Sequence, residues 1–188
     1  MLNTVIPIFS TGAGAATGDF ESIATVTVGS GGAADIEFTS IPATFAHLQV
    51  RCIARGTTSA NTVQVDGRVN GDTGNNYAHH TLYADGSSVS AFATSTTNAW
   101  NFQRAAAATA GSNTFGTLII DFLDYANTNK YKTVRELGGI DNNGSGVVSL
   151  HSGLWMNTNA ITSIKLYPNS GNWAQYSHFA LYGIKGAA

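Results

Sequence analysis

Residues 173–186 read WAQYSHFALYGIKG and carry the clearest strand pattern in the chain. Successive side chains of a strand point to opposite faces, so the odd-numbered residues of Phe179–Gly183 should share one face and the even-numbered residues of Ala180–Ile184 the other. Both sets are apolar. The segment is therefore expected to be a strand covered on both sides, by a second sheet or by a neighbouring subunit.

The same period-two alternation recurs along most of the chain, with clusters of Gly, Asn, Asp and Ser between the alternating segments. The expected strands are Ile23–Val28, Ala34–Phe38, Ala46–Arg55, Thr62–Asn70, Tyr77–Ala84, Gly116–Leu123, Lys130–Gly138, Val147–Met156, Ile161–Tyr167 and Trp173–Ile184. Turn clusters such as Asn70–Asp72 and Asp141–Gly144 tolerate the positive φ that hairpins need. The pattern predicts an all-β, jelly-roll-like antiparallel β-sandwich of about 8–10 strands, formed by residues 21–188 as a single domain.

Residues 1–20 do not follow the alternation and are expected to form an extended N-terminal arm. A short apolar patch is followed by a stretch rich in Gly and Ala, which does not favour a helix. The apolar residues of the patch are Val5, Ile6, Ile8 and Phe9. Such a segment should become ordered against a partner, for example along a neighbour's edge strand.

The second irregular region is the long connection from Gly86 to Asn113, in which Arg104–Ala110 forms either a short helix or loop. Long connections are often functional or interfacial. Trp100 is predicted to lie exposed in this loop beside Phe92 and Phe102, where the three rings would make a subunit contact or bind a glycan.

Composition limits the class of function. Charged residues make up 11% of the 188 residues, against about 25% in ordinary globular proteins, and the net charge is -2. A neutral surface of this kind suits a subunit packed against other subunits, or a solvated extracellular β protein. Without a basic stripe, nucleic acid is not an expected partner.

No signal peptide or membrane span is recognised, and the single Cys52 is expected in the core of a protein folded in a reducing cytoplasm.

Several groups of polar residues are candidates for a catalytic or metal site. Asp66–Asn76 contains oxygen ligands suited to calcium, but a turn explains it as well, and Arg68 stands where a calcium loop needs an oxygen. His79 and His80 should point to opposite faces. The remaining candidates are the isolated His47, His151 and His178, the glycine-flanked Ser145, and the pair Asp121 and Asp124. None forms a recognisable catalytic or zinc pattern, so the chain is predicted to be no enzyme and to need no metal or cofactor.

Three segments carry a resemblance to a known family: residues 41–51 (IPATFAHLQVR), residues 68–77 (RVNGDTGNNY) and the closing segment 173–186. Together they resemble virion structural proteins of tailed bacteriophages, among capsid decoration (cement) proteins and tail-fibre-like proteins. The resemblance covers roughly residues 40–85 and 115–186. It implies a jelly-roll-like sandwich that assembles into symmetric oligomers, and it brings no catalytic residues.

Two functions follow as expectations. The first is a capsid cement protein that binds the major capsid protein and copies of itself, as a homotrimer or a dimer, within a virion assembled in the host bacterial cytoplasm. Its expected interface comprises Val5, Ile6, Ile8, Phe9, Phe92, Trp100, Phe102 and Tyr182. The alternative is a tail-fibre or receptor-binding module that recognises a host glycan through loop aromatics. A third hypothesis is a carbohydrate-binding domain of a secreted enzyme.

Overall fold

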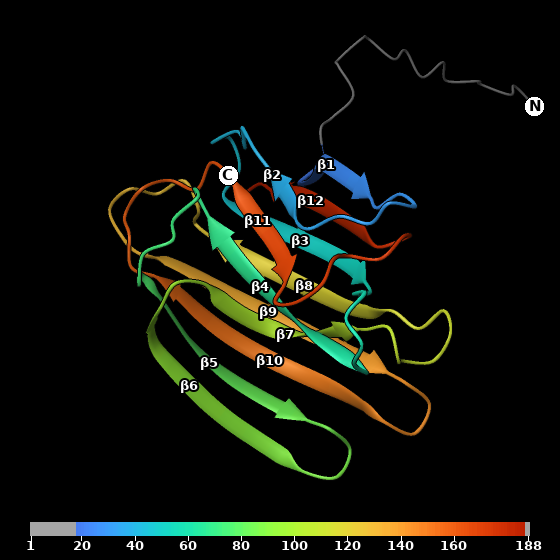
Figure 1. Cartoon of the computed structure of the whole chain (residues 1–188). Helices are drawn as coiled ribbons and strands as arrows, with labels where there is room; N and C mark the ends of the chain where they lie inside the picture. Colours follow the sequence, from blue (N-terminus) through green and yellow to red (C-terminus); the bar gives the residue numbers. More distant parts are fainter. Residues whose placement is uncertain (1–17, 187–188) are drawn as a thin grey trace, which may run out of the picture.

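The computed structural model describes residues 18–186 and is all-β, with two antiparallel sheets facing one another (Figure 1). The larger sheet has eight strands in the order β1 (Phe20–Thr27), β12 (His178–Ile184), β3 (His47–Ala54), β8 (Gly116–Leu123), β9 (Lys132–Asp141), β10 (Gly146–Trp155), β5 (Tyr77–Ala84) and β6 (Val89–Thr97). The smaller sheet has four, in the order β2 (Ile36–Phe38), β11 (Ile164–Pro168), β4 (Thr62–Val69) and β7 (Trp100–Ala106). The predicted antiparallel sandwich is confirmed, with twelve strands in residues 18–186 rather than the expected eight to ten.

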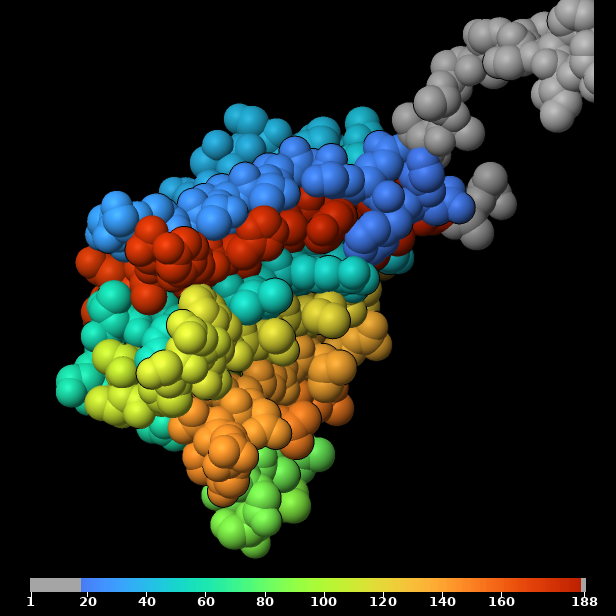
Figure 2. Space-filling view, turned by 90° about the vertical axis from the view of Figure 1, so that its right-hand side faces the viewer, coloured from blue at the N-terminus to red at the C-terminus, as the bar shows by residue number. Residues whose placement is uncertain are grey.

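The topology explains the jelly-roll character. Two consecutive strands that cross from one sheet to the other lie beside two further strands that also cross. Thus β3 pairs with β8 and β4 with β7, and in the same way β12 pairs with β1 and β11 with β2. The remaining strands extend the larger sheet beyond the smaller one as an antiparallel array, from β8 through β9, β10 and β5 to β6. Viewed from the side, the molecule narrows toward the β5–β6 hairpin, drawn in green (Figure 2).

The closing strand β12 has the alternation expected from sequence. Phe179 and Leu181 are fully buried between the sheets, and Gly183 leaves room for the ring of Phe45, which a Cβ there would meet at 2.3 Å. On the opposite, outer face, Tyr182 is half-buried by side chains of its own sheet. Within the described residues no second sheet covers the outer face, so of the two expected covers only a neighbouring subunit is left for that face, and it stays a prediction.

Large aromatic residues fill the space between the sheets. Trp100, Trp155 and Trp173 are all at most 1% exposed. Each indole N–H is nevertheless satisfied: it donates to the carbonyl oxygen of Leu154 at 3.2 Å, to the Asp72 carboxylate at 2.7 Å and to the Leu166 carbonyl oxygen at 3.2 Å, respectively. Rings that bury their area while pairing their one polar group stabilise a core without an unsatisfied donor.

The long connection expected from Gly86 to Asn113 is instead two strands, β6 and β7, and no helix forms at Arg104–Ala110. The register of β7 against β4 shifts between Phe102 and Arg104, so Gln103 is an extra, bulged residue. A bulge reverses the inward–outward alternation, which hid the strand from a period-two reading. Ala105 and Ala106, which follow the bulge, are buried and pass close to Gly116, where a Cβ would lie 2.9 Å from the Ala105 Cα.

Two further expectations concern the ends of the chain. The first strand begins at Phe20, within the stretch assigned to the arm. The arm's apolar patch, formed by Val5, Ile6, Ile8 and Phe9, lies outside the described residues. In residues 18–186 no helix is long and apolar enough to cross a lipid bilayer.

Candidate functional site

An apolar row crosses the outer face of the larger sheet, the face turned away from the smaller sheet. Leu82, Leu150, Leu137 and Ile119 stand directly opposite one another on the adjacent strands β5, β10, β9 and β8. Their side chains are 37% to 54% exposed. We call these four residues the outer stripe.

The outer stripe is widened by further apolar residues and by two hollows. Val148, two residues from Leu150 on β10, is 58% exposed, and Ile53, on the neighbouring strand β3 opposite Thr117, is 50% exposed. The first hollow, of about 520 Å³, lies against β6 and the end of the stripe, where Ala91 and Ala93 are too small to fill the space beside Leu150.

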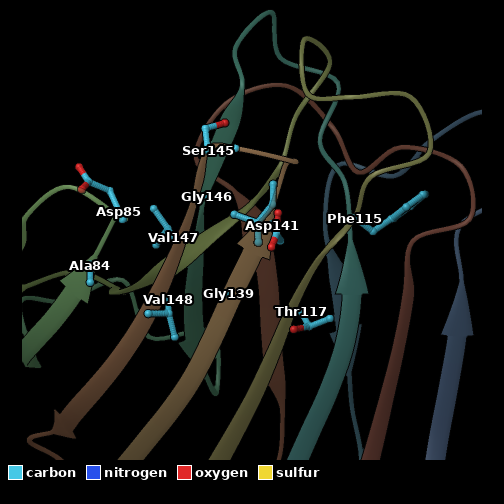
Figure 3. A pocket seen from close by; sticks show the side chains of 13 residues that line it. Ala84, Asp85, Phe115, Thr117, Gly139, Asp141, Ser145, Gly146, Val147 and Val148 are labelled. Atoms are coloured by element: carbon cyan, nitrogen blue, oxygen red, sulfur yellow. The ribbon is translucent and has the colours of Figure 1, made fainter.

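The second hollow, of about 650 Å³, lies next to Val148 between two hairpin turns (Figure 3). Its rim carries Asp85, Asp141 and Ser145 from those turns. The Asp85 carboxylate accepts the amides of Ser87 and Ser88, which lower its pKa to about 2, and Asp141 accepts the Asn143 amide at 2.9 Å. These carboxylates are bound to their own turns, so the hollow is a structural recess with no assembled acid–base pair.

Charge on the outer face is confined to residues that already have partners in the same sheet. The Arg51 guanidinium lies over the rings of Phe20 and Tyr182, 5.1 and 5.7 Å from their centroids. Asp121 accepts hydrogen bonds from Gln49 at 2.7 Å and from Arg135 at 3.0 Å. Arg51 stands directly opposite Ile119 on β3, and Asp121 and Arg135 lie on β8 and β9, each two residues from the stripe. These charges therefore border the four aliphatic residues of the stripe, which are themselves uncharged.

Beneath the outer stripe, the inner face of β9, β10 and β5 carries a group of polar residues. Glu136 on β9, His151 on β10 and Thr81 on β5 are direct cross-strand neighbours, and all three are buried. His151 accepts or donates a 3.0 Å hydrogen bond with the Thr81 hydroxyl and stacks on the His79 ring at 5.0 Å. The expectation that His151 is isolated on its strand is therefore wrong.

Burial sets the protonation of this polar cluster. It raises the pKa of Glu136 to about 8, against which hydrogen bonds from Ser149 and from the Gln103 backbone act only in part. It lowers the pKa of His151 to about 3, and the nearby His79 contributes to the same direction. At neutral pH the carboxyl is protonated and the imidazole is neutral, so the two neighbours form no ion pair.

The polar cluster has a structural explanation. The bulge at Gln103 in β7 turns a backbone group toward the larger sheet, and Glu136 hydrogen-bonds it. Perturbed acid–base groups often mark catalytic sites, but Glu136 and His151 are each 0% exposed. A substrate has no access to them, so we assign the cluster to the core.

Other residues considered from sequence are also accounted for by the fold. The Asp72 carboxylate accepts the Gly74 amide, the Asn76 side chain and the Trp155 indole, which supports the turn interpretation of Asp66–Asn76. Burial raises the pKa of the Cys52 thiol to about 12, in agreement with a core cysteine. Among the described residues no three His, Cys, Asp or Glu side chains are grouped as metal ligands.

The predicted interface residues divide into two groups. Trp100 and Phe102 lie on β7 and are fully buried, so their expected exposure in a loop is wrong, and neither is accessible to a glycan or a partner. Phe92 is 43% exposed on β6, between the rings of His79 and Tyr83. Tyr182 lies on the outer face of β12, stacked on Phe20 at 4.8 Å.

The outer stripe itself was missed from sequence, although one strand carries the signal. In β10 the inward positions are Ser149, His151 and Gly153, whereas Val148 and Leu150 point outward. Alternation alone locates a strand but does not say which of its faces is buried, so the predicted strand Val147–Met156 carried no statement about an exposed apolar face.

Comparison of the chain with protein-family models, with curated proteins and with solved structures gives no match.

Proposed function

We propose that this protein is a non-enzymatic structural subunit of a tailed-phage virion, and that it acts as a capsid decoration (cement) protein on the shell of major capsid subunits. The observation that carries the proposal is the outer stripe: an exposed, uncharged, aliphatic surface on a rigid sheet. The resemblance of residues 41–51, 68–77 and 173–186 to virion proteins directs the proposal toward a capsid.

The chemistry of the stripe favours a protein partner. Sugar-binding surfaces offer aromatic ring faces with polar groups beside them, whereas the stripe is built from leucine and isoleucine. Exposed aliphatic patches rimmed by polar side chains typically mark protein interfaces. With Trp100 and Phe102 buried, the glycan-binding alternative loses two of the three rings that motivated it, and Phe92 alone stays exposed.

The outer face from β8 to β6 contains the outer stripe, and we call it the stripe region. Its size suits repeated, individually weak contacts. From β8 to β6 the sheet spans four strand spacings, about 19 Å, and eight residues of strand extend for about 27 Å, which gives a face of roughly 500 Å². A standard protein interface buries about 800 Å² on each partner. A single copy therefore offers less than a full interface, and occupancy of a shell would depend on many linked contacts.

The test is co-sedimentation with capsids of the phage that encodes the chain. The double variant Leu137→Lys/Leu150→Lys places two charges on the stripe and should reduce capsid occupancy at least tenfold, since desolvating an unpaired charge is costly. Thr25→Lys is the matched control, an exposed position on the outer face of β1 in the same sheet, and should bind as the unaltered protein does.

Unchanged occupancy of the double variant, with folding verified by circular dichroism, would remove the stripe as the docking surface. Failure of the unaltered protein to bind capsids would overturn the cement proposal. Quantitative mass spectrometry of virions gives an independent check, with hundreds of copies expected for cement and a few tens or fewer for a tail component.

A further inference from the structure

The four sheet edges of this molecule are not equivalent, and three of them are protected. β1 is interrupted by a bulge between Ser22 and Ala24. β2 has only three residues, and its Glu37 forms an ion pair with Lys165 at 3.2 Å. β7 is mostly buried, with its bulge bonded to the larger sheet beneath it. Bulges, short strands, charges and burial are the usual means of preventing pairing between exposed edges.

The fourth edge, β6, has none of these protections along most of its length. It runs for nine residues as VSAFATSTT, without a charge, a proline or a glycine. All nine residues are exposed or half-buried. Its pairing with β5 is regular from Val89 to Thr94, and the irregularity lies beyond, toward Thr97, near the positive φ of Thr96. Within residues 18–186, β6 has no hydrogen-bonded strand on its free side.

The direction of the free hydrogen-bonding groups follows from the hairpin turn. The Asp85 amide donates to the Ser88 carbonyl at 3.2 Å, so these two residues form a hydrogen-bonded pair. Bonded and non-bonded pairs alternate along an antiparallel ladder. Val89, Ala91 and Ala93 occupy the non-bonded positions opposite β5 and direct their N–H and C=O groups outward.

We propose that β6 pairs antiparallel with β6 of a second copy of this chain, joining two larger sheets into one continuous sheet across a twofold axis. An uncharged strand is complementary to itself, because its twofold copy opposes it with no like charges. The exposed Phe92 rings, which project on the inner side beyond the smaller sheet, gain cover from the partner's strand. The pairing closes at two copies because each β6 has one free edge.

The area of the outer face also favours a second copy as the occupant. A twofold axis perpendicular to the sheet keeps both outer faces on one side, so the two stripe regions form a single surface of about 1,000 Å². This exceeds the roughly 800 Å² that one side of a standard interface buries. The pairing itself does not rest on the proposed capsid role, but it would supply the two-point attachment that such a role needs.

The first experiment measures the mass of the purified full-length protein by sedimentation equilibrium at 1 to 100 µM, without capsids. We expect a dimer. Ala91→Pro removes an outward N–H while leaving the bonds to β5 intact, and should raise the dimer dissociation constant at least 100-fold. Ala91→Ser keeps the N–H and should remain dimeric. A monomeric or trimeric unaltered protein, or a folded Ala91→Pro dimer, would overturn the proposal.

A charge-exchange pair covers the case in which the proline variant does not fold. Ala91→Lys/Ala93→Lys and Ala91→Glu/Ala93→Glu both place exposed charges on β6, so each should be monomeric alone. An equimolar mixture should form a heterodimer, since opposite charges then face one another. A mixture that stays monomeric would count against β6 pairing.

Hydrogen exchange distinguishes the second copy from the other available occupant, residues 1–17. In a β6-paired dimer the amides of Val89, Ala91 and Ala93 are protected, and protection falls on dilution to monomer. A monomer whose amides are protected, and which loses that protection when residues 2–17 are deleted, would assign the edge to the N-terminal segment and refute dimer pairing. Because these readouts need no capsid, their failure is separate from failure of the cement proposal.

Discussion

The two ends of the larger sheet are built with opposite polarity. At the β1–β12–β3 end the inner face is apolar, with Val50, Phe179 and Leu181 fully buried, and the outer face carries Arg51 and its partners. At the β9–β10–β5 end the inner face carries a buried polar cluster, and the outer face carries the leucines of the stripe. The first end follows the usual rule for a half-exposed sheet, whereas the second reverses it.

The reversal distinguishes the surface that the chain covers itself from the surface that it leaves exposed. At the β1 end the sandwich completes its own burial, and the edge is bulged. At the β6 end the smaller sheet gives little cover, β6 is exposed along its length, and apolar side chains face solvent. Aliphatic side chains exposed in a regular row contribute little to the stability of the isolated chain beyond contacts with their cross-strand neighbours, which is why we propose an assembly interface for them.

The largest effect is expected from a charge on the inner face at the β1 end. Leu181→Asp places a carboxylate among fully buried apolar side chains. Its neighbour on β3 is Val50, and no residue of the buried polar cluster lies on β12 or β3. We expect a loss of more than about 5 kcal/mol in the free energy of unfolding, and so an unfolded chain at 25 °C. Circular dichroism and urea denaturation measure this.

The matched control for that substitution is Tyr182→Asp at the next residue, whose side chain is half-buried on the outer face. It should leave a folded protein. If Leu181→Asp folds with near-native stability, the two ends do not differ as described.

The polar inner face at the other end should make stability depend on pH. Glu136 has a raised pKa of about 8 in the folded protein, against an ordinary 4.5. The folded state therefore holds a proton that the unfolded state releases, so the contribution of Glu136 to stability falls as pH rises above about 4.5 until it levels above about 8. Between pH 6 and 9 this loss amounts to about 2 to 3 kcal/mol.

Glu136→Gln retains the shape and a hydrogen-bonding amide but does not titrate, so its unfolding free energy should be flat over the same interval. Urea denaturation at pH 6, 7.5 and 9 makes the comparison. An equal decline in the variant would place the titration elsewhere. Acidification of Glu136→Gln tests the opposite sign, because the lowered pKa of His151 predicts loss of stability as pH falls from about 6.5 toward about 3. In the unaltered protein the gain from Glu136 offsets this loss down to about pH 4.5.

Sequence reasoning predicted the β1 end of the sheet far better than the β6 end, for a physical reason. Where the alternation of Leu48, Val50 and Cys52 places apolar side chains inward, a period-two pattern locates both the strand and its buried face. In β6 and β7 that relation fails, because β6 is exposed on both faces and the Gln103 bulge interrupts the alternation of β7. The sequence therefore predicted one long connection where the structure has these two strands.

The outer stripe was not predicted from the sequence for a related reason. The turn residues and the core cysteine depend on local backbone and strand patterns, and these were correctly predicted. Which face of β10 is inward depends on where β7 crosses it, a contact between residues about 50 positions apart in the chain. Trp100 illustrates the point: Gly153 of β10 makes room for its ring, with a Cβ there only 2.7 Å from the indole nitrogen.

The smallest effect should come from truncating the outer stripe. Leu150→Ala removes an aliphatic side chain that is 49% exposed and touches no covering layer, so the unfolding free energy of the isolated chain should change by less than about 0.5 kcal/mol. Leu181→Ala, a substitution of the same chemistry at a fully buried position, should cost about 2 to 5 kcal/mol. Urea denaturation at sub-micromolar concentration compares the two while limiting self-association. A loss above 2 kcal/mol for Leu150→Ala would mean that the stripe is already covered within a single chain, which would remove the reason for assigning it to an assembly interface.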